Sequence, residues 1–253
     1  NSFFKTQKLS NIDSYELFAK KSIFEIAKIL DLLDSKIVNK VIYTSSSSVY
    51  GDIIDHNNSR NLNALSKLLM ENYLRNLKTL RKKLIVARIF NMYDENENFS
   101  IISKILNQLK SKKSLTIYNK GEGVRDFIHT LDVAKIYSKL IKSKVLGIVD
   151  VGTGKGIKII DIINALKIKR YNVLKSSNEL KISLANTKKI EKILNKFKIK
   201  SVENFFISKG FKTNKIDRLR FPHQKNFLEP QNSIAIYGCG YSGKKIYDQI
   251  KNK

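Results

Sequence analysis

Short runs of β-branched and apolar residues alternate with amphipathic segments along most of this chain. Residues 40–44 (KVIYT), 84–88 (LIVAR) and 147–151 (GIVDV) have the length and composition of buried strands. Residues 14–33 and 62–80 instead place apolar side chains at helical spacing. Strands that alternate with helices predict a parallel sheet with crossover helices, which is a doubly wound α/β fold.

The same alternation continues along the chain. The pattern predicts a strand in residues 125–130 (RDFIHT) and a shorter one at 115–118. Apolar residues recur at helical spacing in three further segments, 101–109, 132–141 and 159–166. Residues 45–60 are polar and are expected to form a loop, so the first strand leads directly into an exposed, serine-rich segment.

The chain is strongly basic, with a formal net charge of +26 from 48 Lys plus Arg against 22 Asp plus Glu. Most of the positive residues are lysines scattered singly through every segment, and no base-reading motif accompanies them. We interpret the charge as a compositional bias that favours anionic substrates and predict no nucleic-acid partner. A nucleic-acid or protein-interaction role stays open on composition alone, and a steep salt dependence of duplex binding would test it.

Cysteine and histidine usage also narrows the classes of protein. Cys239 is the only cysteine, which excludes a disulfide within the chain and fits a reducing cytoplasm. His56, His129 and His223 are far apart, so no metal site is predicted. No apolar run reaches the roughly 18 residues that a membrane span needs, and no span is predicted.

Two polar features follow the first predicted strand. The segment TSSSSVYG, residues 44–51, lies where ligands bind in an open parallel sheet, at the carboxyl end of a strand. Its hydroxyl groups can hydrogen-bond a substrate oxygen, although an ordinary serine-rich loop has the same composition. Lys67 lies near the start of the next predicted helix, with Glu71 one turn later, and a solvated helical lysine is the alternative to a functional cation.

These features together resemble the extended short-chain dehydrogenases of the NAD-dependent epimerase/dehydratase family, which modify nucleotide sugars. The family has a strand that ends in SS-x-x-VYG and a helix that carries Tyr-x-x-x-Lys. The resemblance continues through ARIFN (87–91), GEGVRDFIHTLDVA (121–134) and VDVGTGKGIKI (149–159). A weaker similarity extends from about residue 14 to about residue 207. The resemblance implies a Rossmann-like sheet with a smaller C-terminal substrate lobe.

The resemblance also implies a role for individual residues. Ser46 matches the residue that hydrogen-bonds the reacting sugar oxygen, and Lys67 matches the lysine that holds the nicotinamide ribose. Asn91 and Arg125 match residues that contact the nucleotide-diphosphate part of the substrate, and the arginine fork suits phosphate oxygens. A structural ion pair of Arg125 with Asp126 or Asp132 is the alternative, and Asn91 has the alternative of bracing the following loop.

One departure from the family pattern concerns catalysis. The family's catalytic tyrosine stands four residues before the lysine, and this chain has Asn63 there. An amide cannot act as a general acid or base near neutral pH. The resemblance predicts NAD(P)-dependent epimerisation, dehydration or reduction of a nucleoside-diphosphate sugar. The alternative is a catalytically impaired relative that binds nucleotide sugar without efficient turnover.

The chain is expected to be cut at both ends and to hold three parts. Residues 1–214 are predicted to form an epimerase/dehydratase domain without its N-terminal cofactor-binding part, and residues 215–231, with both prolines, a linker. Residues 232–253 are predicted to open a second Rossmann-like domain, in which Gly238, Gly240 and Gly243 follow a strand and let backbone approach a phosphate. A strand-to-helix turn without a ligand is the alternative.

The expected ligands are NAD or NADP and a nucleoside-diphosphate sugar. Because the family's own glycine-rich turn lies upstream of the first residue, we expect weak NAD(P) binding by the chain alone. A homodimer and a fused C-terminal domain are the further partners expected. Ser46, Lys67, Asn91 and Arg125 should converge on one cleft at the carboxyl ends of the strands.

Overall fold

The computed structural model describes residues 12–33, 36–51, 62–112, 114–176 and 180–219. The chain divides into two compact units, Asn1–Pro222 and His223–Lys253. All described residues belong to the first unit. The predicted second Rossmann-like domain, with Gly238, Gly240 and Gly243, lies outside the described residues.

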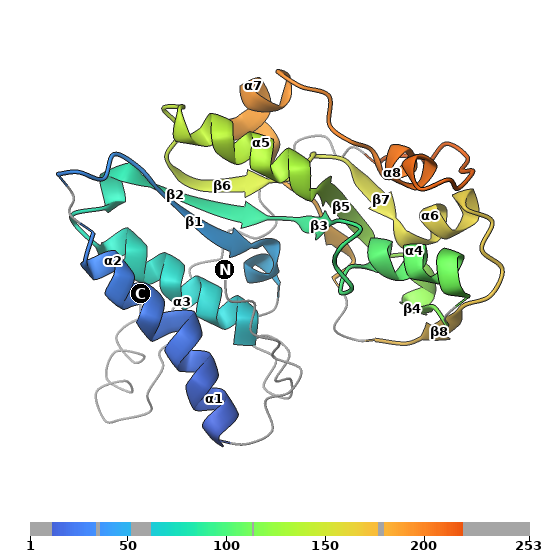
Figure 1. Ribbon diagram of the computed structural model, residues 1–253, viewed down its shortest axis with the longest axis horizontal. Helices are drawn as coiled ribbons and strands as arrows, with labels where there is room; N and C mark the ends of the chain where they lie inside the picture. Colours follow the sequence, from blue (N-terminus) through green and yellow to red (C-terminus); the bar gives the residue numbers. More distant parts are fainter. Residues whose placement is uncertain (1–11, 34–35, 52–61, 113, 177–179, 220–253) are drawn as a thin grey trace, which may run out of the picture. The chain divides into compact units, whose positions relative to one another are not determined.

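The first unit is built around a three-stranded parallel sheet of order β1-β2-β6. Its strands are β1 (Val41–Ser46), β2 (Leu84–Ile89) and β6 (Gly147–Val151), the three buried strands that the sequence predicts. Helices cover both faces of this sheet (Figure 1). The arrangement confirms the predicted doubly wound α/β fold.

One face of the sheet packs on the N-terminal helices. They are α2 (Glu25–Asp31) and α3 (Leu62–Asn76), and a π-helical stretch, η2 (Lys20–Phe24), joins α2 to the preceding helix α1 (Ile12–Ala19). Leu84 and Val86 of β2 point into this layer, where they meet Met70 and Leu74 of α3. Because side chains alternate across a strand, the residues between them point to the other face.

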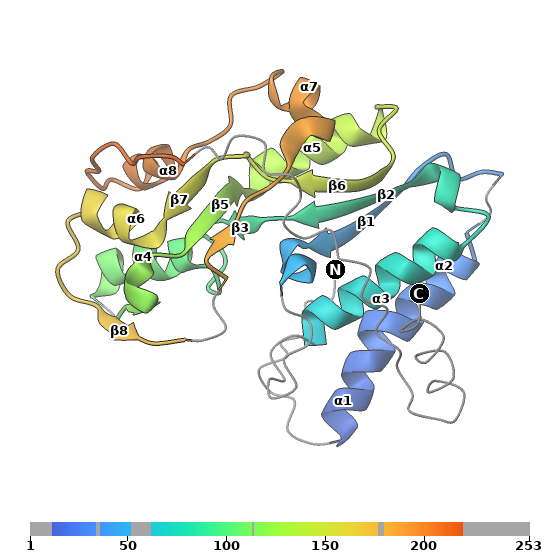
Figure 2. The same cartoon turned by 180° about the vertical axis from the view of Figure 1, so that it is seen from behind.

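The opposite face packs on α5 (Thr130–Ile141), the short helix η7 (Thr187–Ile190) and α7 (Glu191–Leu194). Ile85 and Ala87 of β2 contact this layer in a core that includes Ile136 and Leu140 of α5. Figures 1 and 2 show α5 and α3 on opposite sides of the sheet from both directions. The central strand is therefore apolar on both faces, which explains its continuous LIVA run.

A second, smaller layer follows the first sheet. Its strands are β3 (Asn91–Tyr93), β5 (Val124–His129), β7 (Gly156–Lys158) and β9 (Ile182–Ser183), and β5 pairs with all three others. A separate parallel pair joins β4 (Thr116–Tyr118) to β8 (Asn172–Leu174). The helices are α4 (Ile101–Ser111), α6 (Ile159–Ala165) and α8 (Val202–Ser208). They share one core, in which Ile105, Phe127, Ile162 and Phe205 are buried.

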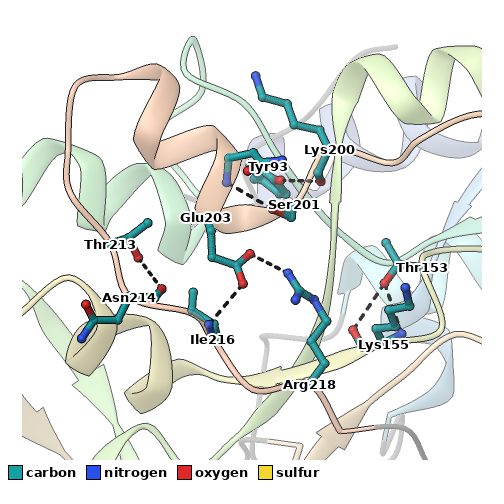
Figure 3. A network of polar contacts seen from close by, with 11 residues as sticks. Tyr93, Thr153, Lys155, Lys200, Ser201, Glu203, Thr213, Asn214, Ile216 and Arg218 are labelled. Carbon is teal, nitrogen blue, oxygen red and sulfur yellow. Dashed lines mark hydrogen bonds and ion pairs between the residues drawn. The ribbon is translucent and has the colours of Figure 1, made fainter.

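The last described segment is packed on this lobe. Ile216 is 2% exposed, and its backbone N–H donates to Glu203, whose carboxylate also pairs with Arg218 (Figure 3). Leu219 exchanges two backbone hydrogen bonds with Gly156. The packed chain thus continues to at least Leu219, so residues 215–219 of the predicted linker pack on the lobe, and the rest of that predicted linker lies outside the described residues. The contacts with Glu203 and Gly156, together with the buried Ile216 side chain, hold residues that sequence composition assigned to a linker.

Two searches of the described residues complete the description. None of their helices combines the length and the apolar character that a membrane crossing requires. Within the same residues, no group of three or more His, Cys, Asp or Glu side chains gathers in a way that would hold a metal ion.

Candidate functional site

The serine-rich segment after β1 forms a tight turn. Ser46 ends the strand and is the N-cap of a short 3-10 helix, η3 (Ser47–Tyr50). Its Oγ accepts hydrogen bonds from the Ser48 backbone N–H at 3.2 Å and from Ser48 Oγ at 2.9 Å. Both contacts use Ser46 as an acceptor, and no described residue accepts its hydroxyl proton. Ser46 is therefore suited to donate a hydrogen bond to a ligand oxygen.

Lys67 extends from α3 to the end of the same strand. Its Nζ donates to the Thr44 carbonyl at 2.9 Å and lies 5.2 Å from the centre of the Tyr43 ring. Burial lowers the pKa of Lys67, whereas the negative charge of Glu71 raises it. The structure thus brings the Lys67 ammonium to the end of β1, where it contacts Thr44, two residues before Ser46.

Asn63 lies in the first turn of α3 and is exposed, one helical turn before Lys67. Residues four apart lie on the same face of a helix, so Asn63 and Lys67 project to the same side. The Asn63 carbonyl accepts a hydrogen bond from Ser66 Oγ at 3.0 Å.

The strand register shows which residues lie at the same level of the sheet. Ser46 pairs with Ile89, and Ile89 pairs with Val151, so the three strands end in one row. Asn91 follows two residues after Ile89, at the carboxyl end of β2. This is the edge at which open parallel sheets bind ligands.

Asn91 and Arg125 lie on the paired strands β3 and β5, where Asn91 is opposite Phe127. Asn91 Nδ2 donates to the Asp126 carbonyl at 3.2 Å, so this side chain braces β5 rather than the loop that follows it. Arg125 Nη1 donates to the carbonyls of Val124 at 2.9 Å and Leu180 at 2.7 Å. The ligand roles predicted for both residues stay predictions.

The contact of Arg125 with Leu180 links the two halves of the candidate site. A Cβ placed at Gly51 would lie 3.6 Å from Leu180 Cδ1, so the leucine packs on the turn that follows Ser46. Arg125 therefore holds a segment that reaches the serine-rich turn. The alternative ion pairs of Arg125 with Asp126 and Asp132 are absent among these described residues. Asp126 accepts from Thr153, and Asp132 pairs with Lys135.

Sequence reasoning missed a buried polar cluster beside the serine-rich turn. It consists of Ser45, Tyr50, Glu71, Arg88 and Asp150. A signal was present, because Arg88 and Asp150 interrupt the apolar strand runs LIVAR and GIVDV. A charge within a buried strand requires a partner, although the sequence alone does not say which residue supplies it.

Comparisons with known proteins identify the family of the chain. The model of the NAD dependent epimerase/dehydratase family matches residues 7–152. The UDP-glucose 4-epimerase of Dictyostelium discoideum is 29% identical over 173 residues, which cover 55% of this chain and 50% of that protein. The chain spans about half the length of the curated relatives it matches.

Solved structures show the same fold. The UDP-N-acetylglucosamine 4-epimerase of Methanobrevibacter ruminantium M1 superposes with a TM-score of 0.58 at 24% identity, over 79% of this chain and 74% of that one. The UDP-glucuronic acid 4-epimerase of Bacillus cereus, in complex with UDP-glucuronic acid and NAD, gives 0.61 at 19% identity, over 82% and 73%. The family model covers more than half of the chain and includes the Ser46 turn, Lys67 and Arg125. This protein belongs to the NAD dependent epimerase/dehydratase family.

Proposed function

We propose that the protein acts on a nucleoside-diphosphate sugar by NAD(P)-dependent epimerisation, dehydration or reduction. The observation that supports this is the meeting of Ser46 and Lys67 at the carboxyl end of β1. Ser46 would donate its hydroxyl proton to a sugar oxygen. Lys67 would present its ammonium group from helix α3. Its contact with Thr44 of β1 holds that group near Ser46, which lies on the same strand.

The donor set of Lys67 fits a cofactor ribose. An ammonium group has three protons, and among the described residues the Thr44 carbonyl accepts one of them. The remaining protons suit ribose hydroxyl oxygens. Bound NAD(P) would supply the hydride acceptor for oxidation of a sugar carbon. A phosphate-binding role of Gly238, Gly240 and Gly243 is a separate proposal about residues outside the described part.

The substrate proposal rests on the names of the relatives and on charge. The similar proteins named above act on UDP sugars. The formal charge of +26 favours an anionic ligand. Arg125, whose Nη1 donates to two backbone carbonyls, would contact the diphosphate through its guanidinium group. The homodimer and the fused C-terminal domain stay predictions.

Asn63 favours a second candidate function, in which nucleotide sugar is bound without efficient turnover. Proton transfer by a positioned side chain typically contributes about 10²–10⁴-fold to a rate. The Asn63 amide does not ionise near neutral pH, so it cannot serve as a general acid or base. Ser46 and Lys67 would still orient ligands, so binding should outlast catalysis.

The test is to compare the protein, in its full natural length, with its Asn63→Tyr form on a panel of nucleotide sugars with NAD and NADP. A tyrosine at this exposed position faces the same side of α3 as Lys67. We expect turnover to rise by about two orders of magnitude or more. Substrate affinity, measured by titration calorimetry, should change little.

Two outcomes would count against these proposals. If the natural protein is already fully active and the tyrosine form is no faster, another residue is the base and Asn63 does not limit the rate. If neither form binds or converts any nucleotide sugar, the proposed substrate class is wrong. An Asn63→Gln form is the matched control, since it keeps an amide and should not gain activity.

A further inference from the structure

The end of β1 is tied to α3 and β2 through a buried carboxylate. Glu71 of α3 is 1% exposed, and its Oε1 accepts from Ser45 Oγ at 2.5 Å and from Arg88 Nε at 3.1 Å. Arg88 Nη2 donates to Oε2 at 2.6 Å, which completes a two-point ion pair. Ser45 is the residue immediately before Ser46, so Glu71 holds the strand end from which the proposed site is built.

The other end of the serine-rich turn is held by the same arginine. Tyr50 OH donates to Asp150 Oδ1 at 2.6 Å, and the Asn186 backbone N–H donates to Asp150 Oδ2 at 3.0 Å. The Arg88 guanidinium lies 4.5 Å from the centre of the Tyr50 ring. Arg88 therefore contacts both anchors, Glu71 before Ser46 and Tyr50 after it, and the turn between them is fixed at both ends.

Glu71 is also the nearby charge that opposes the burial of Lys67. The two residues are one helical turn apart on α3, where neighbouring side chains face each other. Desolvation lowers the pKa of Lys67, and the Glu71 carboxylate raises it. Helix α3 packs on β1, β2, η2, η3 and η5 (Arg81–Lys83). The charged or titratable side chains of these elements are Tyr43, Arg88, Lys20, Lys21, Tyr50, Arg81, Lys82 and Lys83.

We propose that Glu71 is a positioning residue of this site. It fixes Ser46 through Ser45, and it supplies the negative charge against which the Lys67 ammonium is buried. The inference rests on the proposed function, in which Ser46 and Lys67 act together on one ligand complex. It assigns to the Glu71–Arg88 pair a task beyond holding the fold.

Energetics favour this task over simple stabilisation. Replacing a buried ion pair by apolar or neutral residues of similar volume is often neutral or stabilising, so such a pair is weak evidence for stability. Removing only one partner is costly, because it leaves a buried charge without compensation. The pair couples the strand that carries Ser46 to the helix that carries Lys67, and a neutral pair would keep the packing but lose the charge next to Lys67.

The experiment measures the labelling rate of the Lys67 amine against pH. A limiting amount of an acylating reagent is used, and mass spectrometry quantifies the peptide that contains Lys67. The solvent accessibility of the amine changes the labelling rate by the same factor at every pH. The charges around the amine instead change the pH at which the rate is half-maximal, which is the midpoint. The variants are Glu71→Gln and, because Arg88 alone is costly to bury, the neutral double variant Glu71→Gln/Arg88→Met.

We expect both variants to move the Lys67 midpoint to lower pH. Below the midpoint, the neutral fraction of the amine at a given pH should rise on the order of tenfold. The loss of a nearby opposite charge commonly has an effect of this size. Glu71→Asp keeps the charge and should stay close to the natural protein. Glu203→Gln removes a carboxylate from the ion pair with Arg218 and serves as the matched control, with no effect on Lys67.

A midpoint that stays unchanged or moves to higher pH in both Glu71 variants would overturn the inference. A merely structural role would loosen the site, expose Lys67 and raise its midpoint toward the ordinary value. Turnover has no part in this measurement. A protein that converts no nucleotide sugar but shows the downward shift would therefore refute the proposed function and leave the role of Glu71 standing.

Discussion

The Asp126 carboxylate is fully buried and holds the turn after β6 in place. Oδ1 and Oδ2 accept from the Thr153 backbone N–H at 2.9 and 3.1 Å, and Oδ2 accepts from Gly154 at 2.8 Å and Ala185 at 3.2 Å. A Cβ at Gly152 would lie 2.7 Å from Oδ2, so the close approach requires glycine there. Burial raises the pKa of Asp126, and these donors lower it.

We predict that Asp126→Ala destabilises the protein by about 3 kcal/mol or more. The substitution leaves the N–H groups of Thr153, Gly154 and Ala185 without their acceptor in a buried site, and each such group costs about 1–3 kcal/mol. Urea unfolding followed by circular dichroism measures the change. Asp161→Ala, at a half-buried position in the first turn of α6, is the control and should cost less than about 1 kcal/mol, because the N–H groups that hold the turn after β6 donate to Asp126 and not to Asp161. Equal losses in the two variants would contradict this role of Asp126.

At the scale of single residues, sequence motifs predicted the positions of residues whose partners are near in sequence or are fixed by the fold. The placement of Ser46 and Lys67 at one strand end follows from a strand, a turn and the next helix, and the structure shows it. The contact of Arg125 with Leu180 was not predictable, because a guanidinium donates to any carbonyl that the fold brings near. The partner of a long side chain is a property of packing and leaves no local signal in the sequence.

The turn between β4 and β5 shows how an element constrains its residues. Three consecutive residues have positive φ there, Asn119 (46°), Lys120 (56°) and Gly121 (74°). The Asn119 side chain compensates by bonding the backbone of Ser176 twice, at 2.7 and 2.9 Å. A Cβ at Gly121 would lie 2.9 Å from the Ile160 backbone nitrogen, so a side chain has neither the conformation nor the space.

We predict that Gly121→Ala destabilises the protein by more than the strain of a positive φ alone, which is about 1 kcal/mol. Gly210 is the matched control, because its φ is 84° and nothing lies within 4 Å of an added Cβ. Gly210→Ala should therefore cost about 1 kcal/mol, and Gly121→Ala at least about 2 kcal/mol. Thermal unfolding of both variants measures the difference. Equal costs would show that Ile160 moves aside without penalty.

Elements with a clear period were predicted, and most of the very short strands were not, although β4 was. The helices from α1 to α6 and the strands of the first sheet fall within a few residues of the segments predicted for them, since their apolar faces or runs extend over several residues. Strands β3, β7 and β9 have two or three residues, too few for any periodicity. Each exists because β5 offers a partner edge, and pairing with a distant segment is decided by tertiary packing.

At the scale of the whole molecule, the residues of the candidate site all precede the second compact unit. Ser46, Lys67, Asn91 and Arg125 lie within Asn1–Pro222, and so do the three hydrophobic cores. The last described residues, Ile216 to Leu219, contact the lobe through Glu203 and Gly156. The linker at residues 215–231 and the second domain at residues 232–253 stay predictions, and the described residues show that packing continues to Leu219.

We predict that ending the chain at Pro222 leaves the first unit folded and its site intact. The cores lose no residue, so the midpoint of thermal unfolding should change by less than about 2 °C, the shift that about 1 kcal/mol produces in a domain of this size. Nucleotide-sugar affinity, measured by titration calorimetry on the natural and shortened proteins, should agree within about twofold, which is less than 1 kcal/mol.

The glycine motif at Gly238, Gly240 and Gly243 is removed in the same variant, so the comparison also tests whether that motif serves the first site. A loss of affinity of about tenfold or more with an unchanged unfolding midpoint would show that the second unit contributes to sugar-nucleotide binding. A lowered midpoint would instead show that residues after Pro222 complete the fold of the first unit.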